Sequence, residues 1–375
     1  MKISAIRTWI MGVPGRNWTF VKIQTDEGLH GWGEATLEWN EPAVAEGVKL
    51  MSEHLIGRDP ARIEKIWQIL FRHHWWRDST IMMTALSGID QALWDIKGKV
   101  AGQPVYQLLG GACRDRISLY ARGDLGLGSE IKEAEAARQE GFGAFKGGVE
   151  LCDHFDEDAQ IRKMVSDCEA IEKSLGRDFQ IMLDLGGVFS VDGTLRLVEG
   201  LRGRNIGWIE EPVSALTLDA MSDLVAAKLN VPFSLGERLC HRWDFKPVFE
   251  QKAADIVQPD VCHAGGISEI RRIAAMAEVF GVLVAPHNPL GPVAMAASVH
   301  AAAAMPNFLI LEYCRRSPLF HQVQKQGIEI RDGFAELPGT PGLGIELDES
   351  LIEQHPYQPM PRRLWIRADG TIPLI

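Results

Sequence analysis

Six polar residues follow short apolar runs at a nearly constant interval between positions 184 and 312. Successive members are 23 to 27 residues apart, and they are Asp184, Glu210, Glu237, Asp260, His287 and Glu312. One strand, one helix and two short loops occupy about that many residues, since a βαβ unit takes roughly 30. Each run therefore predicts a parallel strand with a polar residue at its C-terminal end, where the active sites of α/β barrels lie.

The first three members of this series are carboxylates: Asp184, Glu210 and Glu237. A single carboxylate at a strand end is typical of a helix cap or a solvent contact. Three at successive strand ends would repel one another and raise one another's pKa. A hard divalent cation removes that conflict, and a ligand set made only of oxygen suits Mg²⁺ better than zinc. The three residues therefore predict a magnesium site.

The next two members, Asp260 and His287, have the residue types of a general base and its partner. An aspartate within reach of an imidazole fixes its tautomer and raises its basicity. A histidine in the run APHNP could instead be structural, but its place beside a metal triad favours catalysis. Glu312 would hydrogen-bond an enolate oxygen or orient the substrate. Lys146, which ends the run AFK, would supply a cation at the mouth of the barrel, where the C-terminal ends of the strands meet.

The spacing predicts eight parallel strands with helices between them. We expect them near residues 117–121, 142–147, 179–184, 206–210, 232–237, 255–260, 281–286 and 308–312. An open sheet that binds a dinucleotide would show a G-x-G-x-x-G phosphate turn after its first strand, and the chain does not have that order of glycines there. The expected fold is a TIM-type (β/α)7β barrel in the α/β class.

The flanking regions predict a second unit. Residues 1–36 read as a meander of antiparallel strands, and residues 41–100 have the period of amphipathic helices. The last part of the chain is rich in Gly and Pro, with short strands. We therefore expect an α+β capping domain over residues 1–115, completed by about 330–375, and a catalytic barrel over 116–329.

Two parts of the expected cap carry residues that could reach a ligand. Segment 12–18 is rich in Gly and Pro, and we expect a loop that exposes Arg16 and Trp18, either an ordinary hairpin loop or a lid over the site. The run RHHWWR is cationic and aromatic. Most of its tryptophans are expected in the core, but His74, Trp76 or Arg77 could reach a ligand, and His74 and Trp76 are the candidates for substrate contact.

Composition limits the classes of partner. The chain has 375 residues and a formal net charge of −11, which argues against nucleic acid because phosphate neutralisation needs a basic face. Its six cysteines show no CxxC pair, so we expect reduced thiols in a cytoplasmic protein. No stretch approaches the 18 apolar residues of a membrane span. An anionic substrate would need a local cation, which Mg²⁺ and Lys146 would supply.

The strand-end motifs IEEP, LGE, QPD, APH and LEY, together with Asp184, resemble the mandelate racemase subgroup of the enolase superfamily. The resemblance covers the whole chain, including the run SGIDQALWDIKGK in the expected cap. The run APHNPLGPVA, residues 285–294, is most similar to acid-sugar dehydratases of the galactonate type.

This resemblance implies a mechanism and a substrate class. The substrate carboxylate would chelate Mg²⁺ held by the three carboxylates, and His287, supported by Asp260, would remove the α-proton. The metal and Lys146 would stabilise the enediolate, and loss of the β-hydroxyl as water would give a 2-keto-3-deoxy acid. The substrate would be an aldonate or aldarate, and the resemblance also implies a homo-oligomer.

Two glycines depart from the pattern of the subgroup. Gly148 stands where many members have a second lysine base, and Gly186 stands where the galactonate-type dehydratases have a histidine acid. The leaving hydroxyl would then be protonated by His287 in a syn elimination, or by His74, Arg16 or a metal-bound water. Two alternatives follow: a one-base isomerase or cycloisomerase of a carboxylate, and a catalytically weakened acid-sugar-binding protein.

Overall fold

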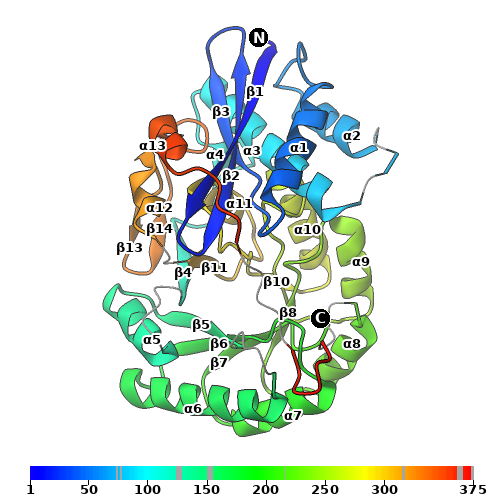
Figure 1. Cartoon of the computed structure of the whole chain (residues 1–375), viewed down its shortest axis with the longest axis vertical. Coiled ribbons are helices and arrows are strands. Elements are labelled where there is room, and N and C mark those ends of the chain that lie inside the picture. Colours follow the sequence, from blue (N-terminus) through cyan, green and yellow to red (C-terminus); the bar gives the residue numbers. More distant parts are fainter. Residues whose placement is uncertain are drawn as a thin grey trace.

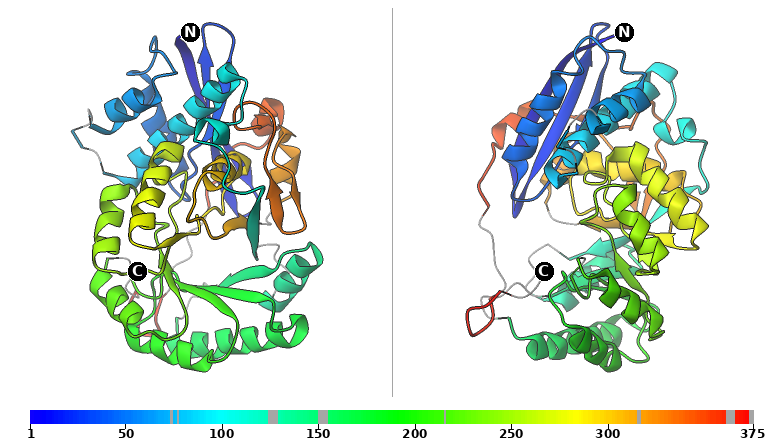
Figure 2. Two further views of the ribbon diagram at one scale, coloured as in Figure 1. Left: turned by 180° about the vertical axis from the view of Figure 1, so that it is seen from behind. Right: turned by 90° about the vertical axis from the view of Figure 1, so that its right-hand side faces the viewer.

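The computed structural model describes residues 1–72, 75–76, 78–123, 129–149, 155–214, 216–314, 317–360 and 366–372. A smaller α+β unit lies above a ring of strands and helices (Figure 1). The two views of Figure 2 show the same stacking from behind and from the side. No helix in the described part of the chain is long and apolar enough to cross a membrane.

The capping unit is an antiparallel sheet covered by helices. Its strands are β1 (Ile3–Val13), β2 (Arg16–Thr25) and β3 (His30–Glu34), in the order β1-β2-β3. Its helices are α1 (Glu41–Ser52), α2 (Ile63–Arg72) and α3 (Thr80–Ala101). Helix α3 approaches β3 so closely that a Cβ on Gly33 would lie 1.9 Å from the carbonyl oxygen of Gly88. The predicted meander is confirmed.

The expected loop over residues 12–18 is wrong. Strands β1 and β2 continue through this segment, and only Pro14 and Gly15 form the turn, with a φ of 79° at Gly15. The C-terminal region explains the extra length, because Gly12 N donates to the carbonyl of His355 and Met11 forms a bridge with Pro356. The Gly and Pro residues mark a tight turn that points toward the barrel (Figure 1).

The barrel has the predicted (β/α)7β architecture. Its strands are β4 (Arg116–Arg122), β5 (Ala144–Gly148), β6 (Gln180–Asp184), β7 (Ile206–Glu210), β8 (Phe233–Leu235), β9 (Ile256–Val257), β10 (Leu283–Val284) and β11 (Leu311–Cys314). Each pairs in parallel with the next from β4 to β10, and β11 pairs with β4. A parallel bridge between Val284 and Phe308 closes the ring.

In the described part of the barrel, seven helices connect these strands and form the outer ring. They are α5 (Glu130–Gln139), α6 (Glu157–Leu175), α7 (Val191–Gly200), α8 (Leu218–Ala226), α9 (Arg242–Glu250), α10 (Gly266–Val279) and α11 (Pro292–Ala303). A short helix, α4 (Val105–Leu108), lies between the cap and the first barrel strand.

The barrel interior is layered because side chains alternate along each strand. One apolar cluster inside the ring consists of Tyr120, Ala144, Met182, Trp208, Ile256 and Ala285. The residue two positions further along the chain from each of these is polar: Arg122, Lys146, Asp184, Glu210, Gln258 and His287. The period of a strand thus places a polar layer directly beyond the apolar one, toward the C-terminal ends of the strands.

The C-terminal region contacts both units. Strands β13 (Ile330–Arg331) and β14 (Phe334–Glu336) extend the barrel sheet, since β14 pairs with β4. Residues 342–358 pack on the cap and include β15 (Glu346–Leu347), which pairs with β12 (Gln324–Gln326), and α13 (Glu349–Gln354), which packs on β1. Short helix α12 (Leu319–Gln322) precedes them.

Residues 330–375, expected to complete the cap, divide between the two units in the described structure. Residues 342–358 pack on the cap, whereas β13 and β14 belong to the barrel sheet. The final described segment also returns to the barrel, where Phe155 N donates to the carbonyl of Ile366 at 2.6 Å. In Figure 1 the segment 366–372 accordingly lies beside the barrel rather than the cap.

Candidate active site

Three carboxylates converge at the C-terminal ends of β6, β7 and β8. One oxygen each from Asp184, Glu210 and Glu237 lies within 4.8 Å of the others. The side chains of Asp184 and Glu237 are 15% and 21% exposed, whereas that of Glu210 is 1% exposed. The oxygen cluster therefore has a buried floor, formed by Glu210, and opens to solvent on the other two sides.

Glu210 is held on both of its oxygens. Its Oε1 accepts from Lys146 Nζ at 2.7 Å, and its Oε2 accepts from Trp208 Nε1 at 3.1 Å and from Gln258 Nε2 at 2.7 Å. Burial raises the pKa of Glu210 to about 7, because the charge of Lys146 only partly opposes burial and the repulsion from Asp184 and Glu237. A further cation would relieve this repulsion, so the all-oxygen cluster fits a hard divalent ion such as Mg²⁺.

Two cations of the barrel balance part of the negative charge. Lys146 Nζ lies between Glu210 and Glu312, 3.2 Å from Glu312 Oε1, and its side chain has no exposed surface. Burial lowers the pKa of Lys146, but these two carboxylates outweigh that effect and raise it well above its ordinary value. Arg122 Nη1 lies 3.3 Å from Asp184 Oδ2 and 3.7 Å from Glu312 Oε1. Lys146 is thus a permanent cation at the floor of the mouth.

Arg122 was missed in the sequence. It lies in register with Lys146 on the neighbouring strand and extends the first barrel strand one residue beyond its expected end. The signal that could have found it is the alternation from Tyr120, which points into the barrel two residues earlier.

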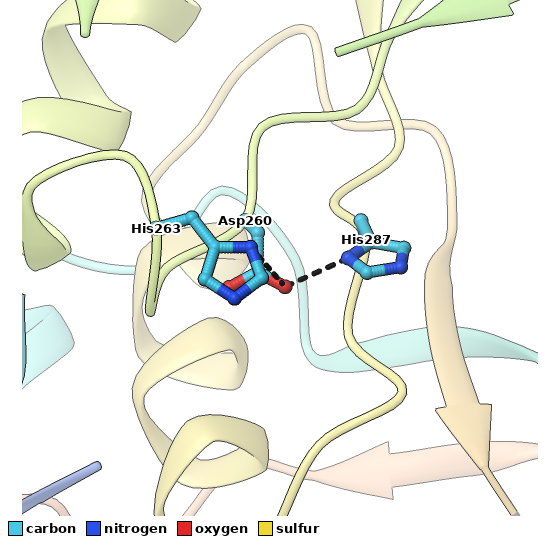
Figure 3. A group of neighbouring side chains, drawn as sticks. All are labelled: Asp260, His263 and His287. Atoms are coloured by element: carbon cyan, nitrogen blue, oxygen red, sulfur yellow. Dashed lines mark hydrogen bonds and ion pairs between the residues drawn. The ribbon is translucent and has the colours of Figure 1, made fainter. Parts of the chain in front are cut away.

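His287 and Asp260 form a hydrogen-bonded pair on the loops that follow β10 and β9. His287 Nδ1 lies 2.7 Å from Asp260 Oδ2 (Figure 3), and the other carboxylate oxygen accepts from Cys262 N at 2.6 Å. An ionised Asp260 fixes the proton of the imidazole on Nδ1. The Nε2 atom then faces the carboxylate cluster, 3.2 Å from Glu237 Oε2. The pair thus places Nε2 of the imidazole beside the candidate metal site.

The electrostatics of His287 favour its protonated form. Burial alone lowers the pKa of His287, but the charge of Glu237 and the hydrogen bond with Asp260 outweigh it and raise the pKa to about 10. Because Glu237 is the largest raising contribution, any cation that engages this carboxylate also lowers the pKa of His287.

A second histidine lies beside Asp260 and was also missed. His263 Nδ1 lies 3.7 Å from Asp260 Oδ2, the same oxygen that His287 contacts (Figure 3). Its Nε2 lies 3.0 Å from the carbonyl oxygen of Thr36 in the cap. The spacing Asp-x-x-His was the available signal, because three residues is one turn of a tight loop.

Glu312 is buried and fixed. Its Oε2 accepts from Asn288 N at 3.0 Å, and its Oε1 faces Lys146 and Arg122. Burial raises the pKa of Glu312, but Lys146 and His287 outweigh it and hold that pKa far below its ordinary value. An ionised Glu312 accepts hydrogen bonds, so its position suits orientation of Lys146 and of a substrate hydroxyl.

The candidate substrate contacts of the cap lie in different environments. Arg16 is buried, donates from Nη1 to the carbonyl of Pro289 and lies 3.4 Å from Glu38 Oε1. Trp18 is 2% exposed and packs edge-on against Phe320 with ring centroids 6.2 Å apart. Both residues are therefore buried, whereas the sequence predicted that they would be exposed. They are buried because the hairpin packs between the barrel and the C-terminal region.

Of the remaining candidates, Trp76 has a side chain that is 86% exposed, and no described contact brings it to the site. His74 and Arg77 lie outside the described residues.

Comparison with known proteins agrees with this geometry. Residues 130–351 match the family described as enolase C-terminal domain-like, and residues 4–110 match the N-terminal domain of mandelate racemase and muconate lactonizing enzyme. The D-galactonate dehydratase of Ralstonia pickettii is 38% identical over 384 residues, which cover 99% of each chain. This chain belongs to the mandelate racemase/muconate lactonizing enzyme family of the enolase superfamily.

Solved structures from the superfamily superpose over nearly the full length. An enolase from Agrobacterium radiobacter, a candidate galactarate dehydratase with bound Na and L-malate, has a TM-score of 0.91, 32% identity and full coverage of both chains. The 3,6-anhydro-D-galactonate cycloisomerase of Zobellia galactanivorans has a TM-score of 0.88 and 30% identity, covering 96% of this chain and all of the other.

The two glycines that depart from the family pattern have structural consequences. Gly186 has a φ of 58°, its N–H donates to Asp184 Oδ1 at 2.9 Å, and its carbonyl accepts from Arg238 Nη2 at 2.8 Å. A side chain at this left-handed position would be strained. Gly148 pairs with Asp184, and a Cβ there would lie 3.0 Å from the carbonyl oxygen of Asp184. Neither position supplies a second acid or base.

Proposed function

We propose that the protein is a Mg²⁺-dependent dehydratase of an acid sugar, an aldonate or aldarate, that yields a 2-keto-3-deoxy acid. The observation that carries this proposal is the hydrogen-bonded His287–Asp260 pair beside three converged carboxylates. The full-length likeness to a D-galactonate dehydratase supports the substrate class. The charge of −11 makes a local cation necessary for binding an anionic substrate.

Asp184, Glu210 and Glu237 would hold the Mg²⁺, which when bound supplies Lewis-acid polarisation of the substrate carboxylate. Lys146, permanently charged, lies where it can hold the negative charge that develops as the α-proton leaves. His287 Nε2 accepts that proton, and Asp260 stabilises the imidazolium that results. A positioned base contributes about 10²–10⁴-fold to the rate.

The same imidazole would complete the elimination. We infer that His287 returns its proton to the leaving hydroxyl, in a syn elimination, because Gly148 and Gly186 offer no second group. Arg16, His74 and a metal-bound water remain the alternative donors. Arg16 reaches the loop that follows His287 through the carbonyl of Pro289, which favours it as a positioning contact for that loop.

The proposal includes a homo-oligomer, as the resemblance implies. Its test is size-exclusion chromatography with light scattering, in which a monomeric mass of 41.6 kDa would contradict it.

A panel of aldonic and aldaric acids with Mg²⁺, scored for 2-keto-3-deoxy product, tests the activity. We expect turnover of at least one member and none by His287→Asn. Binding of an acid sugar without turnover or α-proton exchange would favour a catalytically weakened binding protein. No binding and no turnover on the whole panel would contradict the substrate class.

One alternative reaction has a specific observation in its favour. A one-base cycloisomerase needs no acid for a leaving hydroxyl, and one superposable structure is named as a cycloisomerase of 3,6-anhydro-D-galactonate. Product analysis separates the two reactions: an isomerase gives a product of unchanged mass in H₂O, whereas the dehydratase product is lighter by one water.

A further inference from the structure

The two halves of the candidate site rest on different units of the molecule. The metal carboxylates lie on barrel strands and are bonded by barrel residues such as Lys146 and Gln258. The base half contacts the cap, in particular the segment from Glu34, the last residue of β3, to Glu38. This asymmetry raises the question of what the cap does for His287.

Glu34 is the residue through which the cap holds the loop after His287. It has no exposed surface, and its Oε1 accepts from Gly291 N at 2.7 Å while its Oε2 accepts from Ala294 N at 2.9 Å. Gly291 and Ala294 lie at the start of α11, where the helix has N–H groups without intrahelical partners. A carboxylate from another unit of the molecule therefore caps the helix that follows the base.

The loop between His287 and α11 is only four residues long, so its two ends cannot move independently. The barrel fixes the beginning, where Asn288 N donates to Glu312. The cap fixes the rest, because Arg16 contacts the carbonyl of Pro289 and Glu34 binds Gly291. Removal of Glu34 would free the C-terminal end of this loop.

The cap also contacts a neighbour of the base pair. Thr36 Oγ1 donates to Glu34 Oε1 at 2.7 Å, and the carbonyl of the same Thr36 lies 3.0 Å from His263 Nε2. His263 lies beside Asp260, so one cap segment contacts both the loop of His287 and a histidine next to Asp260.

We propose that Glu34 is a positioning residue for His287, through which docking of the cap sets the rate of proton abstraction without setting the affinity for the metal. The inference rests on the proposed function, since it assigns His287 as the base. Glu34 touches neither substrate nor metal in this account and acts only through the loop 288–291.

The chain offers a matched control in Asp90. This residue lies on α3 of the cap, is 2% exposed and accepts from Ser268 N at 3.0 Å and Ser268 Oγ at 2.6 Å, in the first turn of α10. Burial raises the pKa of both Glu34 and Asp90 to about 7. The two are buried cap carboxylates at the start of a barrel helix, and only Glu34 bonds the loop of His287.

The test compares Glu34→Gln and Glu34→Ala with Asp90→Asn and Asp90→Ala in the full chain. Misplacement of a reacting group by about 1 Å costs roughly 10²-fold, so we expect Glu34→Ala to lose about 10- to 100-fold in kcat. KM and the Mg²⁺ affinity measured by calorimetry should change less than about twofold, since Glu34 contacts neither the substrate nor the metal and contributes nothing to ground-state binding. Glu34→Gln, which keeps one acceptor oxygen, should recover part of the loss, and the Asp90 variants should keep kcat.

A second readout needs no turnover. In metal-free protein, the NMR signal of the His287 Nδ1 proton, identified by its absence in His287→Asn, should shift or broaden in both Glu34 variants and stay in place in Asp90→Asn. If the wild type turns over no acid sugar, the proposed function fails while this comparison still decides the role of Glu34. An unmoved His287 signal in folded Glu34→Gln, or equal effects of Glu34 and Asp90 substitutions on the signal or on kcat, would overturn the inference.

Discussion

Lys146 has no exposed side-chain surface and lies 2.7 Å from Glu210 and 3.2 Å from Glu312. Removing it leaves two buried carboxylates without their shared cation. Removal of one partner of a buried ion pair costs about 3–5 kcal/mol. We therefore expect Lys146→Met to lower the free energy of unfolding of the metal-free protein by that amount, measured by urea denaturation.

The matched control for this prediction is Lys22→Met. Lys22 Nζ lies 2.6 Å from Glu349 Oε1, but the glutamate side chain is 33% exposed and solvent screens it. The control should lose less stability than Lys146→Met. Equal losses in the two variants would contradict the assigned role of Lys146.

Asp260 acts on catalysis through His287 alone. Substituting Asp260→Asn keeps the shape of the side chain and removes the charge that fixes the imidazole proton on Nδ1. We expect kcat to fall by about 10²-fold or more, with unchanged Mg²⁺ affinity, since general base catalysis is worth about 10²–10⁴-fold. Steady-state kinetics on whichever acid sugar is turned over measures this, and a kcat within threefold of wild type would speak against it.

At the residue scale, the sequence could predict those site residues that recur with the regular spacing of the barrel strands. The six-residue series shares one spacing, and Lys146 lies in the apolar run of the second predicted strand. Glu34 and His263 could not be predicted in this way, because their contact with the site depends on how the cap lies on the barrel. Trp18 was expected at the surface because nothing in its neighbourhood indicates that Phe320, far along the chain, packs against it.

Among the elements, β15 connects the C-terminal region to the cap through one glutamate. Glu346 lies 2.9 Å from His30 Nε2, and its other oxygen accepts from Trp32 Nε1 at 2.9 Å. Burial raises the pKa of Glu346, but these two hydrogen bonds outweigh it and lower the pKa from 4.5 to about 2. The folded state therefore stabilises the ionised carboxylate of Glu346 relative to the unfolded state.

The sign of the resulting pH dependence follows from that lowered pKa. Glu346 contributes stability that is fully present above about pH 4.5 and is lost as the pH falls toward 2. We expect Glu346→Gln to lower the free energy of unfolding at pH 7 by on the order of 1 kcal/mol after solvent screening, with the difference from wild type shrinking below pH 4.5. Urea unfolding at pH 7, 4.5 and 3 measures it, with exposed Glu353→Gln as the control. A constant difference across these pH values would contradict the account.

The type and approximate position of each element could be predicted from the sequence, but its exact bounds could not. The strands of the barrel fall where the apolar runs predict them, yet β9 and β10 pair over only two residues each. Their remaining residues leave the ladder to carry Asp260 and His287 into the mouth. Strands β1 and β2 run longer than expected because residues 355–356 of the C-terminal region bond to the end of β1.

For the whole molecule, the account predicts that Mg²⁺ stabilises the folded state. The triad is assembled only in the folded chain, so a ligand at 100 times its Kd adds about 2.7 kcal/mol. We expect Mg²⁺ to raise the Tm of the wild type and to have no such effect on Asp184→Asn. Asp192→Asn, an exposed aspartate on α7 whose side chain is 80% exposed, should keep the wild-type response. Loss of the response in both variants, or in neither, would contradict the triad as the metal site.

The arrangement of the two units was predictable from composition and period, but the path of the C-terminal region was not. Its short strands pair with both the barrel and the cap, and the period of a short strand does not indicate its partner. Residues 330–336 form strands that extend the barrel sheet beside β4, whereas residues 342–358 pack on the cap. Long-range pairing of this kind is decided by the surfaces that meet, which the local sequence does not encode.

The central claim is that His287 removes the α-proton of an acid sugar. Proton NMR in D₂O with Mg²⁺, on an acid sugar that the panel identifies, follows the C2–H signal of the substrate and the C3–H signal of the product in one sample; C3 of the product carries one hydrogen and one deuterium taken from the solvent. For the wild type, we predict that the first disappears as the second appears. For His287→Asn that binds Mg²⁺ normally, neither should change. Loss of the C2–H signal at the wild-type rate in His287→Asn would contradict the account.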